Sequence, residues 1–267
     1  MRYAQYAPSA ALAPVVECYW ILEGADCGEP QPIVPDGRPE IVLHFGDRFD
    51  RHHPGGRVER QDPAVLVGQL RAPIHLACPG RAGVAAIRLR PSALPAFAGC
   101  AASELTGRTV DLDAIAGSTA SLRERLAAAM TDRERVGLLE SWLLGRIRGT
   151  PARAVSAAVE AILAAPAAAT LPLVAAHAGI GVRQLERRFL VDVGMTPKTF
   201  ARIARLQRAL ARIAGGASLA DAAHACGYYD QPHMTRDFAR LAETSPAAWS
   251  ASGADLTRLF VSDRTNP

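Results

Sequence analysis

A pattern of eight positions occurs twice in the C-terminal half of this chain. The first copy consists of Leu171, Ala175, Gly179, Leu185, Arg187, Phe189, Pro197 and Phe200, and the second of Leu219, Ala223, Gly227, Met234, Arg236, Phe238, Pro246 and Trp249. The offset is 48 residues up to the glycine and 49 after it, so the second copy has one extra residue near Tyr228 and Tyr229. A register kept over eight positions predicts two copies of one unit, each a short helix, a glycine turn and a second helix.

The residue types of each copy suit two helices that cross closely. Small side chains dominate the first helix, and a glycine supplies the positive φ of the turn. The second helix has two large apolar residues four positions apart, which are Leu185 and Phe189 in one copy and Met234 and Phe238 in the other. Because residues four apart are neighbours on a helix, each pair can pack back on the first helix. The intervening positions then point outward.

The outward positions of the second helix carry side chains that can read DNA bases. They are Arg183, Gln184, Glu186 and Arg187 in the first copy, and Gln231, His233, Thr235 and Arg236 in the second. Arg pairs with guanine, Gln pairs with adenine, and the methyl group of Thr contacts thymine. Asp230 is the expected N-cap of the later helix, and Pro232 is tolerated in its first turn. Two helix-turn-helix units therefore predict a DNA-reading domain.

One linker helix is expected between the two units. Thr196 and Pro197 form a helix start signal, and Gly215 with Gly216 forms a helix stop signal. The helix between them has about 18 residues and a length of roughly 27 Å. That length suits recognition helices about one DNA turn, roughly 34 Å, apart. The apolar stripe of this helix is Phe200, Ile203, Leu206, Leu210 and Ile213, and its basic stripe is Arg202, Arg205, Arg208 and Arg212. Arg202 and Arg205 are candidates for phosphate contacts, although such a row is also typical of a solvated face.

The positive charge of the chain is concentrated in the same region. Residues 1–150 contain 17 basic and 17 acidic side chains, whereas residues 151–267 contain 13 basic and 9 acidic ones. Within 183–212 there are eight basic residues and two acidic ones. Such a patch is typical of a surface that follows a phosphate backbone.

Residues from about 155 to 250 resemble the C-terminal DNA-binding domain of the AraC/XylS family of bacterial transcription regulators. The strings GVRQLERRFLVDVGMTPKTF and GYYDQPHMTRDFARLAETSPAAW carry the resemblance. It implies a seven-helix domain whose two recognition helices enter successive major-groove segments on one side of the duplex. The family's base-contacting positions fall on Arg183, Glu186 and Arg187 in the first helix and on Gln231, Pro232, Thr235 and Arg236 in the second.

Two of these positions depart from the family pattern. Glu186 is acidic where a neutral donor is commoner, so it either reads a cytosine amino group or pairs with Arg183 or Arg187. Pro232 has no side-chain hydrogen bond to give. We therefore expect the first recognition helix to carry more of the sequence discrimination.

The N-terminal half has the pattern of a small antiparallel β-domain. Short apolar or alternating runs at Val15–Leu22, Glu40–Phe45, Ala64–Gly68, Ile74–Ala77 and Val84–Leu89 are separated by clusters of Gly, Pro and Asp. The pattern then becomes helical, with amphipathic helices expected at Ser121–Met130 and Arg133–Arg148. The fold class is therefore α+β: a β-barrel or sandwich with trailing helices over 1–150, and an all-α DNA-binding domain over 151–267.

The strings VPDGRPEIVLHFGD, LVGQLRAP and IRLRPSALPAFAG resemble the cupin-like N-terminal domain of one subgroup of these regulators. In the family such domains bind a small effector, dimerise, or do both. The side chains that can line such a barrel are Trp20, His44, Phe45, His75 and Arg88, although each is also compatible with an ordinary core or surface role. No metal is expected, because the chain lacks the closely spaced His-x-His of a metal-binding cupin.

Cysteines and apolar runs argue against several other classes. The five cysteines, Cys18, Cys27, Cys78, Cys100 and Cys226, show no C-x-x-C spacing, so neither a zinc site nor a disulfide framework is expected. No apolar run approaches the roughly 18 residues of a membrane span, and the N-terminus does not look like an export signal. A cytoplasmic protein without cofactors is expected.

Three functions are compatible with these features. The favoured one is a transcription regulator, activator or repressor, whose N-terminal domain senses a small-molecule effector and sets the geometry of a homodimer. The alternatives are a constitutive DNA-binding regulator whose N-terminal domain only dimerises, and a DNA-targeted repair enzyme, which needs an activated cysteine. Expected partners are double-stranded DNA, the effector, a second copy of the chain and, for an activator, RNA polymerase. We expect effector binding to act by shifting the helices of residues 121–148.

Overall fold

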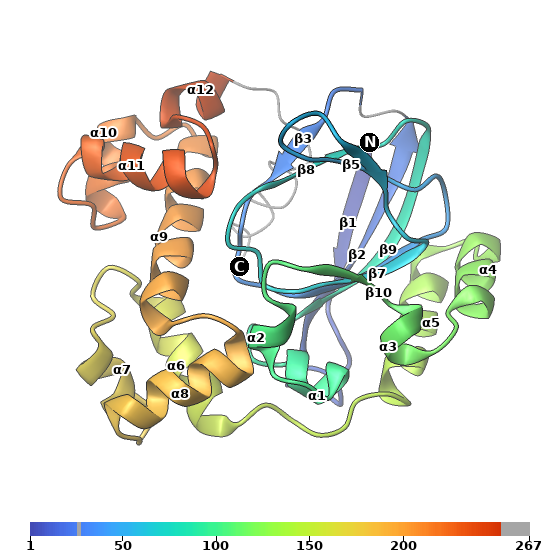
Figure 1. Ribbon diagram of the computed structural model, residues 1–267, viewed down its shortest axis with the longest axis horizontal. Helices are drawn as coiled ribbons and strands as arrows, with labels where there is room; N and C mark the ends of the chain where they lie inside the picture. The colour runs from blue at the N-terminus through green and yellow to red at the C-terminus, as the bar shows by residue number, and fades with distance from the viewer. Residues whose placement is uncertain (26–27, 252–267) are drawn as a thin grey trace.

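The fold was obtained as a computed structural model that describes residues 1–25 and 28–251 (Figure 1). Its strands are β1 (Arg2–Tyr6), β2 (Val16–Ala25), β3 (Gln31–Ile33), β4 (Glu40–His44), β5 (Asp50–His52), β6 (Val58–Arg60), β7 (Ala64–Val67), β8 (Ile74–Ala77), β9 (Arg81–Leu89) and β10 (Thr109–Asp111). The helices of the N-terminal domain are α1 (Leu94–Ala98), α2 (Ala102–Leu105), α3 (Asp113–Ala116), α4 (Ala120–Ala128) and α5 (Asp132–Leu144). Cys27 and residues 252–267 lie outside the described residues.

Two antiparallel sheets form the N-terminal domain. The larger has the order β1-β2-β9-β4-β7-β10 and the smaller has the order β3-β8-β5-β6. Side chains from both sheets, among them Trp20, Val42 and Leu76, form one buried cluster between the sheets. Ile41 and Leu43 point to the other face of the larger sheet, where helices α1 to α5 cover it. This arrangement confirms the predicted small antiparallel β-domain with trailing helices.

The two amphipathic helices expected after the sheets correspond to α4 and α5. Thr131 caps α5, and Glu134 completes a capping box with it. Leu139 and Leu143 of α5 are fully buried against the larger sheet. Both helices end a few residues earlier than the periodicity predicts, because Ala129 is extended and the turn after Leu144 begins at Gly145.

Seven helices make up the described part of the C-terminal domain. They are α6 (Arg153–Ala164), α7 (Leu171–His177), α8 (Val182–Val193), α9 (Pro197–Ala214), α10 (Leu219–Ala225), α11 (Gln231–Leu241) and α12 (Pro246–Ala251). The linker helix α9 has the predicted bounds, and its N-cap Thr196 accepts a hydrogen bond from the Thr199 N–H at 3.2 Å. Figure 1 shows α9 standing between the lower group of α6 to α8 and the upper group of α10 to α12. The α+β fold class is confirmed.

Candidate DNA interface and ligand cavity

The two helix-turn-helix units are α7 with α8 and α10 with α11. Their turn glycines, Gly179 and Gly227, have φ values of 66° and 69°. In both units the residue after the glycine donates its N–H to an alanine carbonyl of the first helix, Ile180 to Ala175 at 3.1 Å and Tyr228 to Ala223 at 3.0 Å. The four apolar residues predicted to pack back, Leu185, Phe189, Met234 and Phe238, are fully buried. The repeat in the sequence therefore corresponds to a repeat in the structure.

The extra residue of the second copy lengthens its turn. Gly181 caps α8 directly after Ile180, whereas Tyr228 and Tyr229 both precede the cap of α11, Asp230. Tyr228 is buried, while Tyr229 is 93% exposed beside the start of α11. Asp230 is confirmed as the N-cap, since its carboxylate accepts from the His233 N–H at 2.7 Å.

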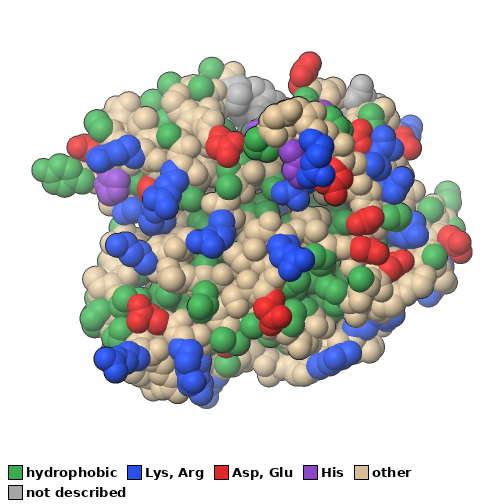
Figure 2. Space-filling model, viewed as in Figure 1, with side chains coloured by type: hydrophobic (Ala, Val, Ile, Leu, Met, Phe, Trp, Pro, Cys, Tyr) green, Lys and Arg blue, Asp and Glu red, His purple; other side chains and the backbone are tan. Residues whose placement is uncertain are grey.

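The outward face of α8 is free of internal contacts. Arg183, Gln184, Glu186 and Arg187 are all exposed. Within residues 1–25 and 28–251, none of these four side chains makes a hydrogen bond or ion pair, so Glu186 pairs with neither neighbouring arginine. Figure 2 shows basic side chains spread over the visible face of the C-terminal domain with fewer acidic ones among them, whereas acidic and basic ones mix over the N-terminal domain.

The outward face of α11 is partly engaged with its own backbone. The Thr235 hydroxyl donates to the Gln231 carbonyl at 3.0 Å, which leaves its methyl group as the outward contact. The Arg236 guanidinium donates through Nε to the Pro232 carbonyl at 3.3 Å. Gln231, Pro232 and Arg236 are exposed, and Thr235 is half-buried.

Three arginines of the linker helix contact protein rather than only solvent. Arg202 and Arg205 form ion pairs with the buried Asp237 of α11, at 2.6 Å and 3.4 Å, and the Arg205 guanidinium stacks on the Tyr228 ring at 4.5 Å. Arg208 donates to the carbonyls of residues 163 and 164 at the end of α6. Arg202 and Arg205 are half-buried and Arg208 is exposed, so the basic stripe packs in part against α11 and α6 and in part faces solvent, and its phosphate contacts stay a prediction.

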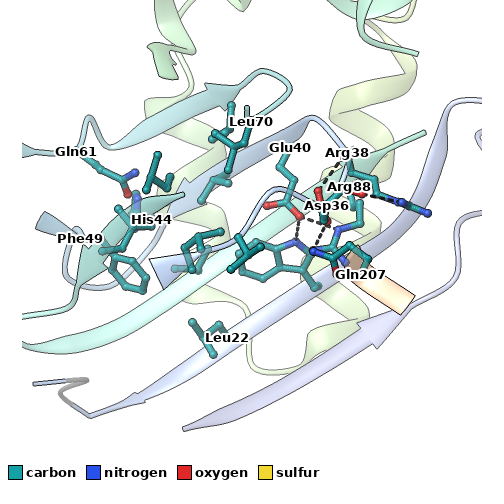
Figure 3. A pocket seen from close by; sticks show the side chains of 18 residues that line it. Leu22, Asp36, Arg38, Glu40, His44, Phe49, Gln61, Leu70, Arg88 and Gln207 are labelled. Atoms are coloured by element: carbon teal, nitrogen blue, oxygen red, sulfur yellow. Dashed lines mark hydrogen bonds and ion pairs between the residues drawn. The ribbon is translucent and has the colours of Figure 1, made fainter. Parts of the chain in front are cut away.

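A cavity of about 70 Å³ lies between the two sheets of the N-terminal domain (Figure 3). Its middle is apolar, with a wall formed by Leu22, Ile33, Val34, Val42, Val67, Leu70, Ile74, Leu76 and Val84. Polar side chains lie at its two ends: Asp36, Arg38, Glu40, Arg88 and Gln207 at one end, and His44 and Gln61 at the other.

Trp20, His44 and Arg88 line this cavity, as predicted for a barrel interior. Phe45 and His75 do not, and their placement in the barrel lining is wrong. Each directly neighbours a residue whose side chain faces the cavity, and successive residues of an extended chain point to opposite faces. Phe45 instead lies under the Arg135 guanidinium of α5 at 4.5 Å.

Ion pairs connect the charged side chains at the Arg88 end. Arg88, which is 2% exposed, donates through Nε to Glu40 at 2.7 Å and lies 3.7 Å from Asp36. The Trp20 indole also donates to Glu40, at 3.2 Å. Burial raises the pKa of Glu40, and the charge of Arg88 opposes that rise. Arg38 is held by Glu17 through two contacts of 2.8 Å and 3.1 Å.

The opposite end is formed by an uncharged histidine. Burial lowers the pKa of His44 to about 4, so the ring is neutral near pH 7. Neither ring nitrogen has a partner of good hydrogen-bond geometry within the described chain, although His44 is only 3% exposed, and the interaction with the Gln61 side chain opposes the fall in its pKa. The Gln61 amide and the Phe49 ring, whose centroid is 5.4 Å from that of His44, lie beside it.

The linker helix α9 forms part of the cavity wall. Gln207 of α9 lines the cavity and donates to the Pro35 carbonyl at 2.7 Å. Nearby, Gly37 has a φ of 79°, and a Cβ atom at this position would lie 2.7 Å from the Phe200 ring of α9. Val34 belongs to the core of the C-terminal domain. Residues 34–37 therefore touch the cavity on one side and the linker helix on the other.

A second contact joins the domains at the end of α8. Helix α2 packs against α8, and the Thr106 hydroxyl donates to the Gly194 carbonyl at 2.8 Å. Helices α4 and α5 instead pack against each other and the larger sheet, on the side away from the C-terminal domain (Figure 1). Helices α8 and α9 thus contact the N-terminal domain, and α6 contacts it through the Ser156 hydroxyl, 3.3 Å from that of Ser92.

Two family models match the chain. Residues 4–111 match a domain of unknown function (DUF6597), and residues 174–252 match a helix-turn-helix domain. Together with the doubled motif, the second match decides the class. Residues 174–252 form an AraC-type helix-turn-helix domain, and the chain is a DNA-binding regulator. The matched helix-turn-helix domain belongs to a non-enzymatic class of DNA-binding proteins, which favours a regulator over the repair-enzyme alternative.

Solved structures of ToxT from Vibrio cholerae share the fold of this AraC-type regulator. One is 8% identical, with a TM-score of 0.53 over 87% of this chain and 97% of that chain. Another, ToxT bound to (E)-4-(8-methylnaphthalen-1-yl)but-3-enoic acid, is 7% identical, with a TM-score of 0.53 over 87% and 98%. No curated protein sequence matches the chain.

Sequence reasoning missed two residues of this regulator. Gln207 is a lone polar residue among the buried positions of α9, and that exception in an apolar stripe was the available signal. Tyr229 was noted only as part of the lengthened turn. In the described chain no group of three or more His, Cys, Asp or Glu side chains is placed to hold a metal, and no helix there is long and apolar enough to cross a membrane.

Proposed function

We propose that this regulator inserts α8 and α11 into successive major-groove segments of one duplex and that a small molecule in the cavity alters this binding. The exposed side chains of α8 and α11 and the doubled glycine turns support the first part. Glu186 accepts from a cytosine amino group in this proposal, which is supported by its exposure and by the absence of an ion pair to either neighbouring arginine in the described chain.

The proposed effect of a small molecule on DNA binding rests on the position of Gln207. It lies in the cavity wall and on the helix that joins the two reading units. A ligand that changes the position of residues 34–37 would therefore act on α9 directly, through Pro35 and Phe200. This route replaces the one expected through residues 121–148, because α4 and α5 pack on the far side of the sheet. The acid in one ToxT structure supports a small molecule as a ligand of this fold.

We further propose a domain boundary between residues 150 and 151, a homodimer that reads two half-sites, contact with RNA polymerase if the protein activates, and a cytoplasmic location. The segment 145–152 lies outside the helices, and Gly149 within it has a φ of 130°, which supports the boundary.

Selection of random DNA duplexes by the full chain tests the DNA-binding part. We expect enriched sequences with two short blocks about one helical turn, roughly 10 base pairs, apart. A single block, or no enrichment, would contradict insertion of both helices.

A compound library, screened for changes in affinity for the selected DNA, tests the coupling. Gln207→Leu should bind DNA and lose most of the ratio between affinities with and without an active compound. Arg212→Ala, a change at an exposed position of the same helix, should keep that ratio even if its absolute DNA affinity falls. A compound effect that is unchanged in Gln207→Leu would exclude this route, and a screen without any active compound would leave a constitutive DNA-binding regulator.

A further inference from the structure

The charge balance of the cavity constrains the ligand, given the proposed function. At the Arg88 end, Arg88 and Arg38 are both held by carboxylates: Asp36, Glu40 and Glu17. Two carboxylates, Asp36 and Glu40, and two guanidinium groups line this end of the cavity, and Glu17 holds Arg38 from outside the lining. Both guanidinium groups are therefore already engaged, and a ligand carboxylate would bring a negative charge next to Asp36 and Glu40, in a place where burial weakens solvent screening.

The His44 end of the cavity favours a ligand group with both a hydrogen-bond donor and an acceptor. A neutral imidazole has one donor and one acceptor nitrogen, and neither has a partner of good hydrogen-bond geometry here, although His44 is only 3% exposed and the Gln61 side chain interacts with the ring. Buried polar atoms without partners are costly, so a ligand group that supplies both an acceptor and a donor would bind there favourably. Figure 3 shows that the Gln61 amide lies beside the same ring and can complete such a contact. An amide group has this donor and acceptor pair, whereas an ionised carboxylate only accepts.

Apolar side chains separate the two ends. Leu22 and Leu70 lie between His44 and Glu40 in Figure 3. Val42, which also lines the cavity, lies between the same two residues along strand β4. Desolvation of the ligand's central part in this region favours an apolar body of small size.

From these three features we propose that the cavity binds a small uncharged molecule with an apolar body and an amide-type group at His44, and that it discriminates against the corresponding carboxylate. The ligand therefore differs in charge from the acid of the ToxT structure.

Isosteric pairs of amide and acid test the proposal with the full-length protein. Benzamide against benzoate, and isobutyramide against isobutyrate, differ in charge at almost constant shape. Calorimetry or ligand-observed NMR at pH 7 should give amide affinities of roughly millimolar strength, at least about tenfold tighter than those of the acids. An acid that binds as tightly as its amide overturns the proposal, and so does failure of both amides to bind.

Two histidine variants form a matched pair. His44→Leu removes polar atoms that have no partner of good hydrogen-bond geometry, so it should fold and lose most of the amide preference. His75→Leu changes the same residue type outside the cavity lining and should retain that preference. Equal loss in both variants would place the amide elsewhere and overturn the proposal.

DNA affinity measured in the same samples separates this inference from the proposed function. Amide binding without any change in DNA affinity supports the ligand class and contradicts ligand control. Acids that bind better and change DNA affinity contradict the ligand class and support ligand control.

Discussion

The two helix-turn-helix units pack alike and differ on their outward faces. On α8 the four reading side chains are exposed and unengaged within the described residues, whereas on α11 Thr235 and Arg236 bond to their own helix. Asp237 of α11 is buried and paired with α9, while the matching position of the first unit is the exposed Arg188. The outward face of α8 is therefore free of internal bonds, whereas α11 is held to the linker helix by ion pairs.

The largest expected effect concerns the ion pairs that hold α11. Asp237→Asn removes the carboxylate paired with Arg202 and Arg205, so the free energy of unfolding should fall by about 2–3 kcal/mol, with a loss of DNA binding by the second unit. Urea unfolding measures the change. Glu186→Gln is the control, since it neutralises an exposed carboxylate on α8 and should leave stability unchanged. Equal stability of both variants would mean that α11 does not need these pairs.

The next effect compares the reading arginines. Arg187→Ala and Arg236→Ala should each cost about 1–3 kcal/mol of binding to the selected DNA, and the cost should be greater for Arg187, which has no bond to its own helix. Titration of selected and random duplexes measures both. Equal losses on the two kinds of DNA would remove that arginine from base recognition, and a larger cost for Arg236 would reverse the comparison.

Arg205→Ala distinguishes a structural arginine from a phosphate contact. It leaves Asp237 with Arg202 alone and removes the stacking on Tyr228, so we expect a loss of about 1 kcal/mol in stability. A normal thermal midpoint with weaker binding to all duplexes, and a smaller salt dependence of that binding, would instead indicate a phosphate contact.

The smallest effect probes the link between the first unit and the N-terminal domain. Thr106→Val removes the donor to the Gly194 carbonyl and should cost about 1 kcal/mol or less. Hydrogen exchange should become faster at the end of α8 and stay unchanged in α11. Ser141→Ala, which removes an exposed hydroxyl on α5, is the control. Faster exchange in both recognition helices would show that the units are not held separately.

Local signals explain why much of the C-terminal domain could be predicted. The start of α9 follows from Thr196 and Pro197 and its end from Gly215, because each of these signals acts on the helical turn next to it. The repeat located both turns, because the glycines and the packing residues keep their spacing. Contacts between residues distant in sequence were not predictable in this way. Asp237 binds arginines more than thirty residues away, so Arg202 and Arg205 of the basic stripe form ion pairs within the protein.

The N-terminal domain shows where periodicity is insufficient. Five of its ten described strands follow from apolar runs, whereas β3, β5, β6 and β10 are only three residues long and β1 carries little apolar character. Both faces of the larger sheet are buried, so alternation separates His44 from Phe45 without indicating which of them faces the cavity. Which of the two residues faces the cavity depends on where the second sheet and the helices pack, and tertiary contacts determine that packing.

The contact between Gln207 and Pro35 limits how this protein can be recombined. A chimera that exchanges residues 1–150 for the sensor of another regulator would also replace one side of an interface whose other side belongs to the reader. New ligand specificity would therefore require substitutions in α9, and such substitutions alter the spacing element between the two recognition helices. The N-terminal domain and the helix-turn-helix domain are separate in sequence, yet the contact between them means that they are not independent modules for evolution or for protein engineering.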